Sequence, residues 1–126
     1  MADFAFDHIH LRSPDAEAAA AFYVDNLGAE IRDRVMNGDA LRVVMNLGGV
    51  AMFIEQVPAG TPPAPMPPHQ GIEHVGLRVA DLAATAASLK AKGVRFTVEP
   101  KSPKPGLSIA FIAAPDGVTV ELLQRG

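Results

Sequence analysis

The 126-residue sequence contains no cysteine, no tryptophan and only one tyrosine. Without cysteine it has neither disulfides nor thiolate metal ligands, which fits a reducing compartment such as the cytoplasm. No apolar run approaches the length that crosses a membrane. The net charge of −3 lacks the basic excess of a nucleic-acid-binding surface. The first residues, Met1-Ala2-Asp3-Phe4, lack the basic and apolar regions of a secretory signal. We therefore expect a cytoplasmic protein that binds neither nucleic acid nor membrane.

Two histidines and two glutamates recur at one spacing. His8 and His74 are 66 positions apart, and Glu55 and Glu121 are also 66 apart (74 − 8 and 121 − 55). Each half of the chain therefore offers one imidazole and one carboxylate. Two neutral imidazoles and two carboxylates can hold a divalent cation at near-zero net charge and leave coordination positions for water or substrate.

The residues around the histidines repeat as well. The segment 7–12 (DHIHLR) matches the segment 73–78 (EHVGLR), and Asp15 matches Asp81 at the same offset. Self-similarity of this length indicates two copies of one supersecondary unit. We expect a first unit over 1–57, a proline-rich linker over 58–71 and a second unit over 72–126, together forming one compact protein.

Hydrophobic alternation and turn residues predict the same order of elements, βαβββ, in both units. In the first unit, Ser13 is the expected N-cap of the helix and Gly28 its stop. In the second unit, Asp81 is the expected N-cap and Gly93 the stop. The expected strands are 4–12, 29–36, 40–47 and 50–57, then 72–79, 94–99, 107–114 and 118–124, with helices over 16–26 and 81–92. This order predicts an α+β fold in which two curved mixed sheets form a cup.

The chain resembles the vicinal oxygen chelate superfamily, which includes glyoxalases, bleomycin-resistance proteins and extradiol dioxygenases. The resemblance covers essentially the whole chain, and its motifs are specific for the superfamily but not for one reaction. They are DHIHL (7–11), FY (22–23) followed by LG (27–28), EHVGL (73–77) and PDGVTVEL (115–122).

The resemblance implies paired βαβββ modules around one divalent metal ion per site, with His8, Glu55, His74 and Glu121 as its ligands. The glyoxalase I branch has His-Glu-His-Glu in this order, whereas methylmalonyl-CoA epimerases have Gln at the position of Glu55. The nature of the ligands fits Ni, Co, Mn, Fe or Zn without choosing among them. The glutathione-gripping features of glyoxalase I are weak here, since an expected Asn is Ala59 and the segment 101–106 replaces a glycine-rich loop.

These residues predict a metal-dependent lyase or isomerase that transfers a proton on a small substrate with oxygens on adjacent carbons. Glu121 and Glu55 are the candidate bases. We expect His10, Arg12 and Arg78 to contact substrate, although His10 could also replace His8 as ligand or orient it.

Two other functions remain open. A non-haem Fe(II) dioxygenase of extradiol type would use only His8, His74 and Glu121. A drug-binding resistance protein would need no metal ligands at all. From the resemblance to bacterial glyoxalase I proteins we further expect a twofold homodimer. Each of its sites would join His8 and Glu55 of one chain to His74 and Glu121 of the other.

Overall fold

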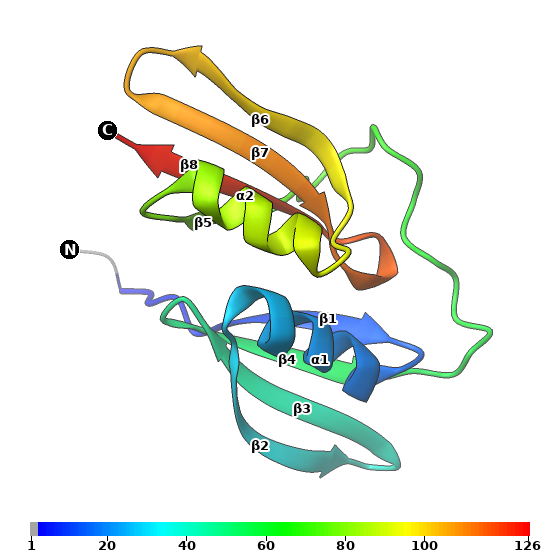
Figure 1. Ribbon diagram of the computed structural model, residues 1–126. Helices are drawn as coiled ribbons and strands as arrows, with labels where there is room; N and C mark the ends of the chain where they lie inside the picture. Colours follow the sequence, from blue (N-terminus) through cyan, green and yellow to red (C-terminus); the bar gives the residue numbers. More distant parts are fainter. Residues whose placement is uncertain (1–2) are drawn as a thin grey trace. The chain divides into compact units, whose positions relative to one another are not determined.

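The computed structural model describes residues 3–126, which divide into two compact units on either side of the Pro62–Pro63 bond. Met1 and Ala2, on which the expected absence of a signal peptide partly rests, lie outside the described residues. Each unit has the element order βαβββ and builds one four-stranded mixed sheet with one α-helix (Figure 1). The predicted α+β fold with two βαβββ modules is confirmed. None of the helices in the described part of the chain is long and apolar enough to span a membrane.

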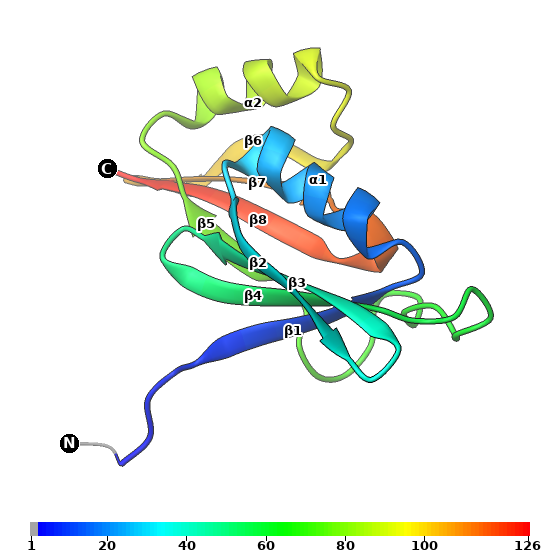
Figure 2. The same ribbon diagram turned by 90° about the horizontal axis from the view of Figure 1, so that it is seen from below.

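The first unit forms a sheet in the order β1-β4-β3-β2, with α1 lying across one face (Figures 1 and 2). β1 pairs with β4 in parallel, and the other neighbours are antiparallel. Its elements are β1 (His8–Ser13), α1 (Ala16–Leu27), β2 (Glu30–Asn37), β3 (Ala40–Leu47) and β4 (Val50–Gln56). β1 is shorter than the predicted strand over 4–12. Phe4 and Phe6 precede it and are exposed.

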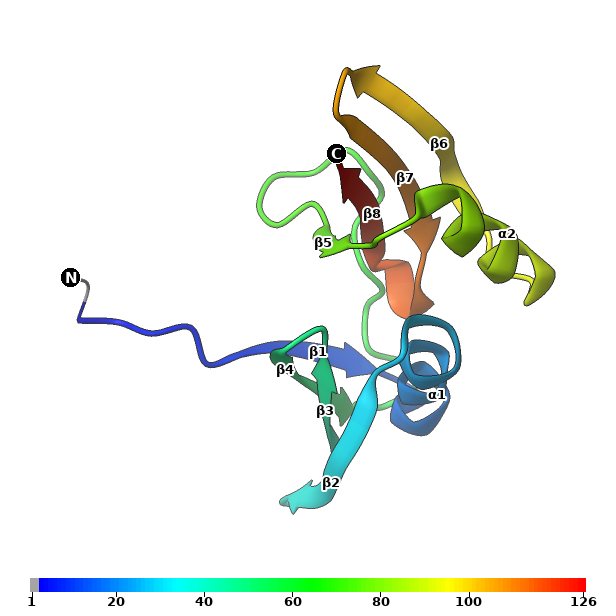
Figure 3. The same ribbon diagram turned by 60° about the vertical axis from the view of Figure 1, so that its left-hand side comes forward.

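The second unit forms a sheet in the order β5-β8-β7-β6, again with its helix, α2, lying across one face (Figure 3). β5 pairs with β8 in parallel. The elements are β5 (Val75–Arg78), α2 (Leu82–Ala91), β6 (Phe96–Lys104), β7 (Leu107–Ala113), a short 3-10 turn (Pro115–Gly117) and β8 (Thr119–Arg125). β5 is only four residues long, so His74 lies directly before the strand and not within it as predicted.

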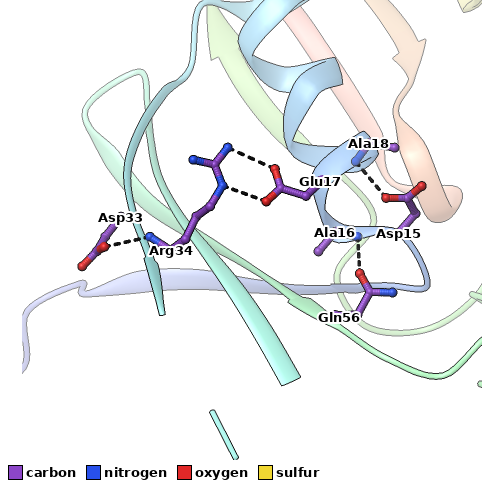
Figure 4. Close-up of polar contacts among 7 residues, drawn as sticks. All are labelled: Asp15, Ala16, Glu17, Ala18, Asp33, Arg34 and Gln56. Atoms are coloured by element: carbon purple, nitrogen blue, oxygen red, sulfur yellow. Dashed lines mark hydrogen bonds and ion pairs between the residues drawn. The ribbon is translucent and has the colours of Figure 1, made fainter. Parts of the chain in front are cut away.

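Each helix begins at an aspartate that accepts a hydrogen bond from the first helical turn. Asp15 Oδ1 accepts from the Ala18 N–H at 3.0 Å, and Asp81 Oδ1 accepts from the Ala84 N–H at 3.1 Å (Figure 4 shows the first). The predicted cap at Asp81 is confirmed. The predicted cap at Ser13 is wrong, because Ser13 ends β1 and its hydroxyl instead accepts from the Asp15 N–H at 3.1 Å.

A glutamine of the last strand also fixes the start of each helix. Gln56 Oε1 accepts a hydrogen bond from the Ala16 N–H at 2.7 Å, as Figure 4 shows. Gln124 Oε1 accepts one from the Leu82 N–H at 2.8 Å. Helix starts leave backbone N–H groups without partners inside the helix, and these side chains satisfy one of them in each unit. The contact ties each helix to the sheet that it covers.

Each unit has an apolar core between its helix and the face of the sheet that the helix covers. In both units the core residues alternate along the strands, so every second side chain points away from the helix. The core residues of the first unit include Ala20, Tyr23, Val43, Met45, Met52 and Ile54, and those of the second include Leu82, Leu89, Ala110, Ile112, Val120 and Leu122. The sheet face without a helix therefore carries the side chains left for chemistry.

The two units do not repeat at a single spacing. In β1 and β5 the matching residues are 66 apart, as in Ile9 and Val75. Their strand partners, Met52 on β4 and Val120 on β8, are 68 apart (120 − 52). The helix-capping glutamines are also 68 apart (124 − 56). Matching residues of the last strands, β4 and β8, are thus two positions further apart in the sequence than matching residues of the first strands, β1 and β5.

Candidate metal-ligand and substrate-binding residues

In the second unit, His74 and Glu121 face each other. His74 Nε2 lies 3.2 Å from Glu121 Oε1, and on its other side His74 Nδ1 lies 2.8 Å from Glu73 Oε2. Glu121 sits on β8 opposite Gly76, two residues after His74. The side chains of His74 and Glu121 are 29% and 18% exposed. An imidazole with one nitrogen held by a carboxylate presents the other in a fixed direction, as metal-bound histidines do.

His8 in the first unit also has a carboxylate beside its Nδ1, that of Asp7. Its Nδ1 lies 2.6 Å from Asp7 Oδ2, which matches the contact between His74 and Glu73. The imidazole stacks on the ring of Phe53, with centroids 4.1 Å apart and planes 18° apart. The carboxylate and the aromatic ring together fix the orientation of His8 and leave its Nε2 as the atom available to bind a ligand.

Glu55 does not lie beside His8. The strand partner of His8 is Ala51, and Glu55 lies four residues further along β4, about 13 Å at the usual rise per residue. Glu55 Oε1 accepts hydrogen bonds from Arg42 Nη2 at 2.8 Å, from Arg42 Nε at 3.2 Å and from Asn37 Nδ2 at 3.0 Å. Glu55 therefore forms an ion pair with Arg42 on β3.

These hydrogen bonds also set the charge of Glu55. Those from Arg42, and then that from Asn37, hold the pKa of the Glu55 carboxyl below its ordinary value. The side chain is only 14% exposed, so solvent weakens the ion pair less than it would at an open surface. A carboxylate held ionised in this way accepts a proton poorly.

On the same sheet face, His10 lies near both Glu55 and Phe53. Its Nε2 is 3.7 Å from Glu55 Oε1, and its ring is 6.0 Å from the ring of Phe53. Partial burial lowers the pKa of His10, and the Arg42 guanidinium lowers it further. A neutral imidazole next to Arg42 can accept a hydrogen bond, and the role of His10 as a substrate contact stays a prediction.

The remaining predicted residues lie further out. Arg12 is exposed and pairs with Glu55 across β1 and β4, whereas Arg78 is exposed and pairs with Leu123 across β5 and β8. Sequence reasoning missed Arg42, Asn37 and Phe53, because only the strand register places them near the site residues. Asp7 and Glu73 were also missed. Their matched positions directly before His8 and His74 were the signal that could have found them.

Among residues 3–126, no three or more side chains of His, Cys, Asp or Glu gather in a group that could hold an ion. The chemistry of these side chains nevertheless suits a metal ion. His8 and His74 each have Nδ1 held by a carboxylate, and His74 Nε2 faces the carboxylate of Glu121.

The family is established by comparison with known proteins. The sequence model of the Glyoxalase/Bleomycin resistance protein/Dioxygenase superfamily matches residues 5–122. The chain belongs to this superfamily. An ethylmalonyl-CoA/methylmalonyl-CoA epimerase of Cereibacter sphaeroides is 32% identical over 138 aligned positions, which cover 94% of this chain and 96% of the epimerase. A probable chloroplastic lactoylglutathione lyase of Arabidopsis thaliana is 47% identical over 57 residues. That match covers 44% of this chain and only 16% of the lyase.

Solved structures agree on the fold. The glyoxalase family protein from Enterococcus faecalis superposes with a TM-score of 0.82 at 22% identity. The superposition covers 98% of this chain and 99% of that one. Proteins of this superfamily include enzymes such as glyoxalase I and methylmalonyl-CoA epimerase, and its members typically use a divalent metal ion.

Proposed function

We propose that the protein is a metal-dependent lyase or isomerase that moves a proton on a small substrate bearing oxygens on adjacent carbons. The observation that carries the proposal is the pair in the second unit, where His74 Nε2 and Glu121 Oε1 are 3.2 Å apart and Glu73 holds the other nitrogen of the ring. The proposed ligands are His8, His74 and Glu121. Glu55, the fourth predicted ligand, has Arg42 as its partner instead.

Each residue has a distinct task in this proposal. When bound, the ion polarises a substrate carbonyl and stabilises the negative charge that develops as the adjacent C–H bond is broken. Glu121 is the proposed acceptor of the proton, because its carboxylate is not paired with an arginine as that of Glu55 is. His10 and Arg12 are proposed to bind the polar or anionic part of the substrate, and Arg78 is proposed to do so from the second unit.

An activity screen tests the proposal. Protein purified without chelators is loaded separately with Ni, Co, Mn, Fe or Zn and offered α-ketoaldehyde hemithioacetals and acyl-CoA epimers. The epimers are included because the full-length relative from Cereibacter sphaeroides is named an epimerase. The proposal predicts turnover without oxygen. It fails if no loaded form turns over either class of substrate.

A second candidate is an extradiol-type dioxygenase, favoured by one observation. Two histidines and one carboxylate, the set left when Glu55 is paired with Arg42, are the ligands of many non-haem Fe(II) oxygenases. Oxygen uptake with a catechol and Fe(II), but not with Ni or Co, would support this candidate. Catechols therefore belong in the same screen.

We also propose that the protein works in the cytoplasm as a twofold homodimer in which each site takes ligands from both chains. Refolding a mixture of His8→Ala and His74→Ala proteins tests the shared site. A mixed dimer would regain one site in which both histidines are intact, and with it part of the activity. If no mixture regains activity, or if the protein has a monomeric mass in solution, this part of the proposal is excluded.

A further inference from the structure

The sheet faces without helices carry different residues in the two units, although the units share one fold. In the second unit, the cross-strand row through Glu121 reads Gly76 on β5, Glu121 on β8 and Phe111 on β7. In the first unit, the corresponding row reads His10, Phe53 and Val44. The structural counterpart of Glu121 is therefore Phe53, and not Glu55.

Glu55 lies in the next row, where its neighbours are two arginines. Arg12 on β1 and Arg42 on β3 are its partners across the strands on either side. The matching row of the second unit is Arg78, Leu123 and Ile109 and holds no carboxylate. A carboxylate between two arginines matches the charge that surrounds it, and Glu55 already receives hydrogen bonds from both Nε and Nη2 of Arg42.

Phe53 contacts the face of the His8 ring, whereas its counterpart Glu121 contacts the Nε2 atom of His74. Its ring stacks on His8 at 4.1 Å, and the Arg42 guanidinium lies 5.8 Å from its centroid. In the second unit, Phe111 meets His74 edge-on at 5.2 Å, and Glu121 supplies the contact to Nε2. An aromatic ring thus supports the histidine in both units, but only the second unit adds a carboxylate.

We propose that Glu55 is the fixed counter-ion of Arg42 and not a metal ligand, and that the first unit contributes His8 alone to the metal while Phe53 positions it. This inference rests on the proposed function for its metal part. Glu55 holds Arg42, whose guanidinium lies 5.8 Å from the centroid of the Phe53 ring that stacks on His8. Arg42 is thus a positioning and recognition group beside the metal ligand His8. The row formed by Arg12, Glu55 and Arg42 has a net charge of +1 and suits an anionic substrate group.

The first test measures metal binding on the full chain, with matched carboxylate variants. Co²⁺ is titrated into the wild type, Glu55→Ala, Glu55→Gln and Glu121→Ala, and binding is followed by visible absorption and calorimetry. We expect both Glu55 variants to keep the wild-type Kd for Co²⁺. Glu121→Ala should weaken binding by at least about tenfold, the lower end of what loss of even an outer partner of a ligand costs. Equal weakening by Glu55→Ala, Glu55→Gln and Glu121→Ala overturns the inference and leaves the proposed function standing.

The second test needs no metal. Thermal melting of metal-free Glu55→Gln, Arg42→Met and the double variant forms a double-mutant cycle. We expect the loss of Tm in the double variant to be smaller than the two single losses added together. Glu121→Gln with Arg78→Met is the control cycle and should be additive, because Arg78 pairs with Leu123 and not with Glu121. Additive losses for Glu55 and Arg42 overturn the counter-ion assignment. If the wild type binds no Co²⁺, the proposed function and the metal part of the inference fail, and the cycle alone decides the role of Glu55.

Discussion

Phe53 on β4 and Glu121 on β8 occupy the same position relative to the first strand of their units, opposite His10 and Gly76 respectively. One unit therefore places a ring beside its histidine where the other places a carboxylate. The two halves of the proposed metal site are consequently unequal, although they fold alike.

The outer carboxylates should affect metal affinity without contacting the ion. Asp7→Asn and Glu73→Gln remove the charge that holds Nδ1 of His8 and His74. We expect each substitution to weaken Co²⁺ binding about 10-fold to 100-fold, as loss of such a partner commonly does. Calorimetric titration measures the change. Glu30→Gln is a matched control, since its partner Arg32 lies on β2 and contacts neither histidine. Unchanged affinity in both variants would show that these carboxylates do not orient the rings.

Glu121 should matter more for turnover than for binding. In Glu121→Gln the amide oxygen can still face His74 Nε2, but it cannot take up a proton at the reaction's pH. We expect a large fall in kcat with a smaller change in metal content. Steady-state kinetics with the substrate found in the screen, together with metal analysis, give both quantities. A variant that keeps its metal and full kcat would remove Glu121 as the base.

The ion pair between Glu17 on α1 and Arg34 on β2 predicts a pH dependence of stability. Arg34 Nε and Nη2 donate to the two Glu17 oxygens at 2.7 Å and 3.0 Å (Figure 4). The hydrogen bonds from Arg34 lower the pKa of Glu17 from its ordinary value of 4.5. Folding is therefore favoured by the ionised form, and this contribution is present above pH 4.5 and lost as the pH falls through the lowered pKa.

Thermal melting of Glu17→Gln measures this effect. The Tm of the variant should lie below that of the wild type at neutral pH, and the gap should close in acid. Both side chains are about half exposed, so the gap should also shrink at high salt. A gap that stays constant from neutral pH into acid would mean that the charge of Glu17 contributes nothing.

Loss of the α2 cap should destabilise the second unit. Asp81→Ala removes the acceptor for the Ala84 N–H, and such a loss typically costs about 1 kcal/mol. Urea unfolding followed by circular dichroism measures the free energy of unfolding. Asp81→Asn keeps an acceptor oxygen and should lose less. Equal losses in the two variants would assign the effect to charge at the helix end and not to the hydrogen bond.

The elements of this fold were predictable because their signals are local. The aspartate cap at Asp81 and the left-handed Gly28 after α1 each depend on a few neighbouring residues. The order βαβββ and the position of His8 and Glu121 on the sheet face without a helix follow from the alternation along β1 and β8.

The pairing of Glu55 with Arg42 was not predictable, because it depends on turn lengths. Leu47 and Val50 are joined by two residues, Gly48 and Gly49. Their equivalents in the second unit, Ala114 and Val118, are linked by a hydrogen bond from the Ala114 N–H to the Val118 carbonyl and are joined by three residues, Pro115–Gly117. A further residue is gained before β7, where β6 has irregular register. These two extra residues raise the spacing between matching residues from 66 in the first strands to 68 in the last strands. Glu55 and Glu121, which are 66 apart, therefore lie at different positions on β4 and β8.

The most direct test of the account is the metal content of the protein and of its histidine variants. Wild type, His8→Ala, His74→Ala, the double variant and His69→Ala are purified without chelators, and bound metal is measured per chain. His69 is exposed, and its Nδ1 contacts only the Gln70 carbonyl in the described structure, so its variant is the control. We predict about one ion per chain in the wild type and in His69→Ala, as the proposed shared sites require, with sharp losses in both single variants. Full metal content in the double variant would contradict the account.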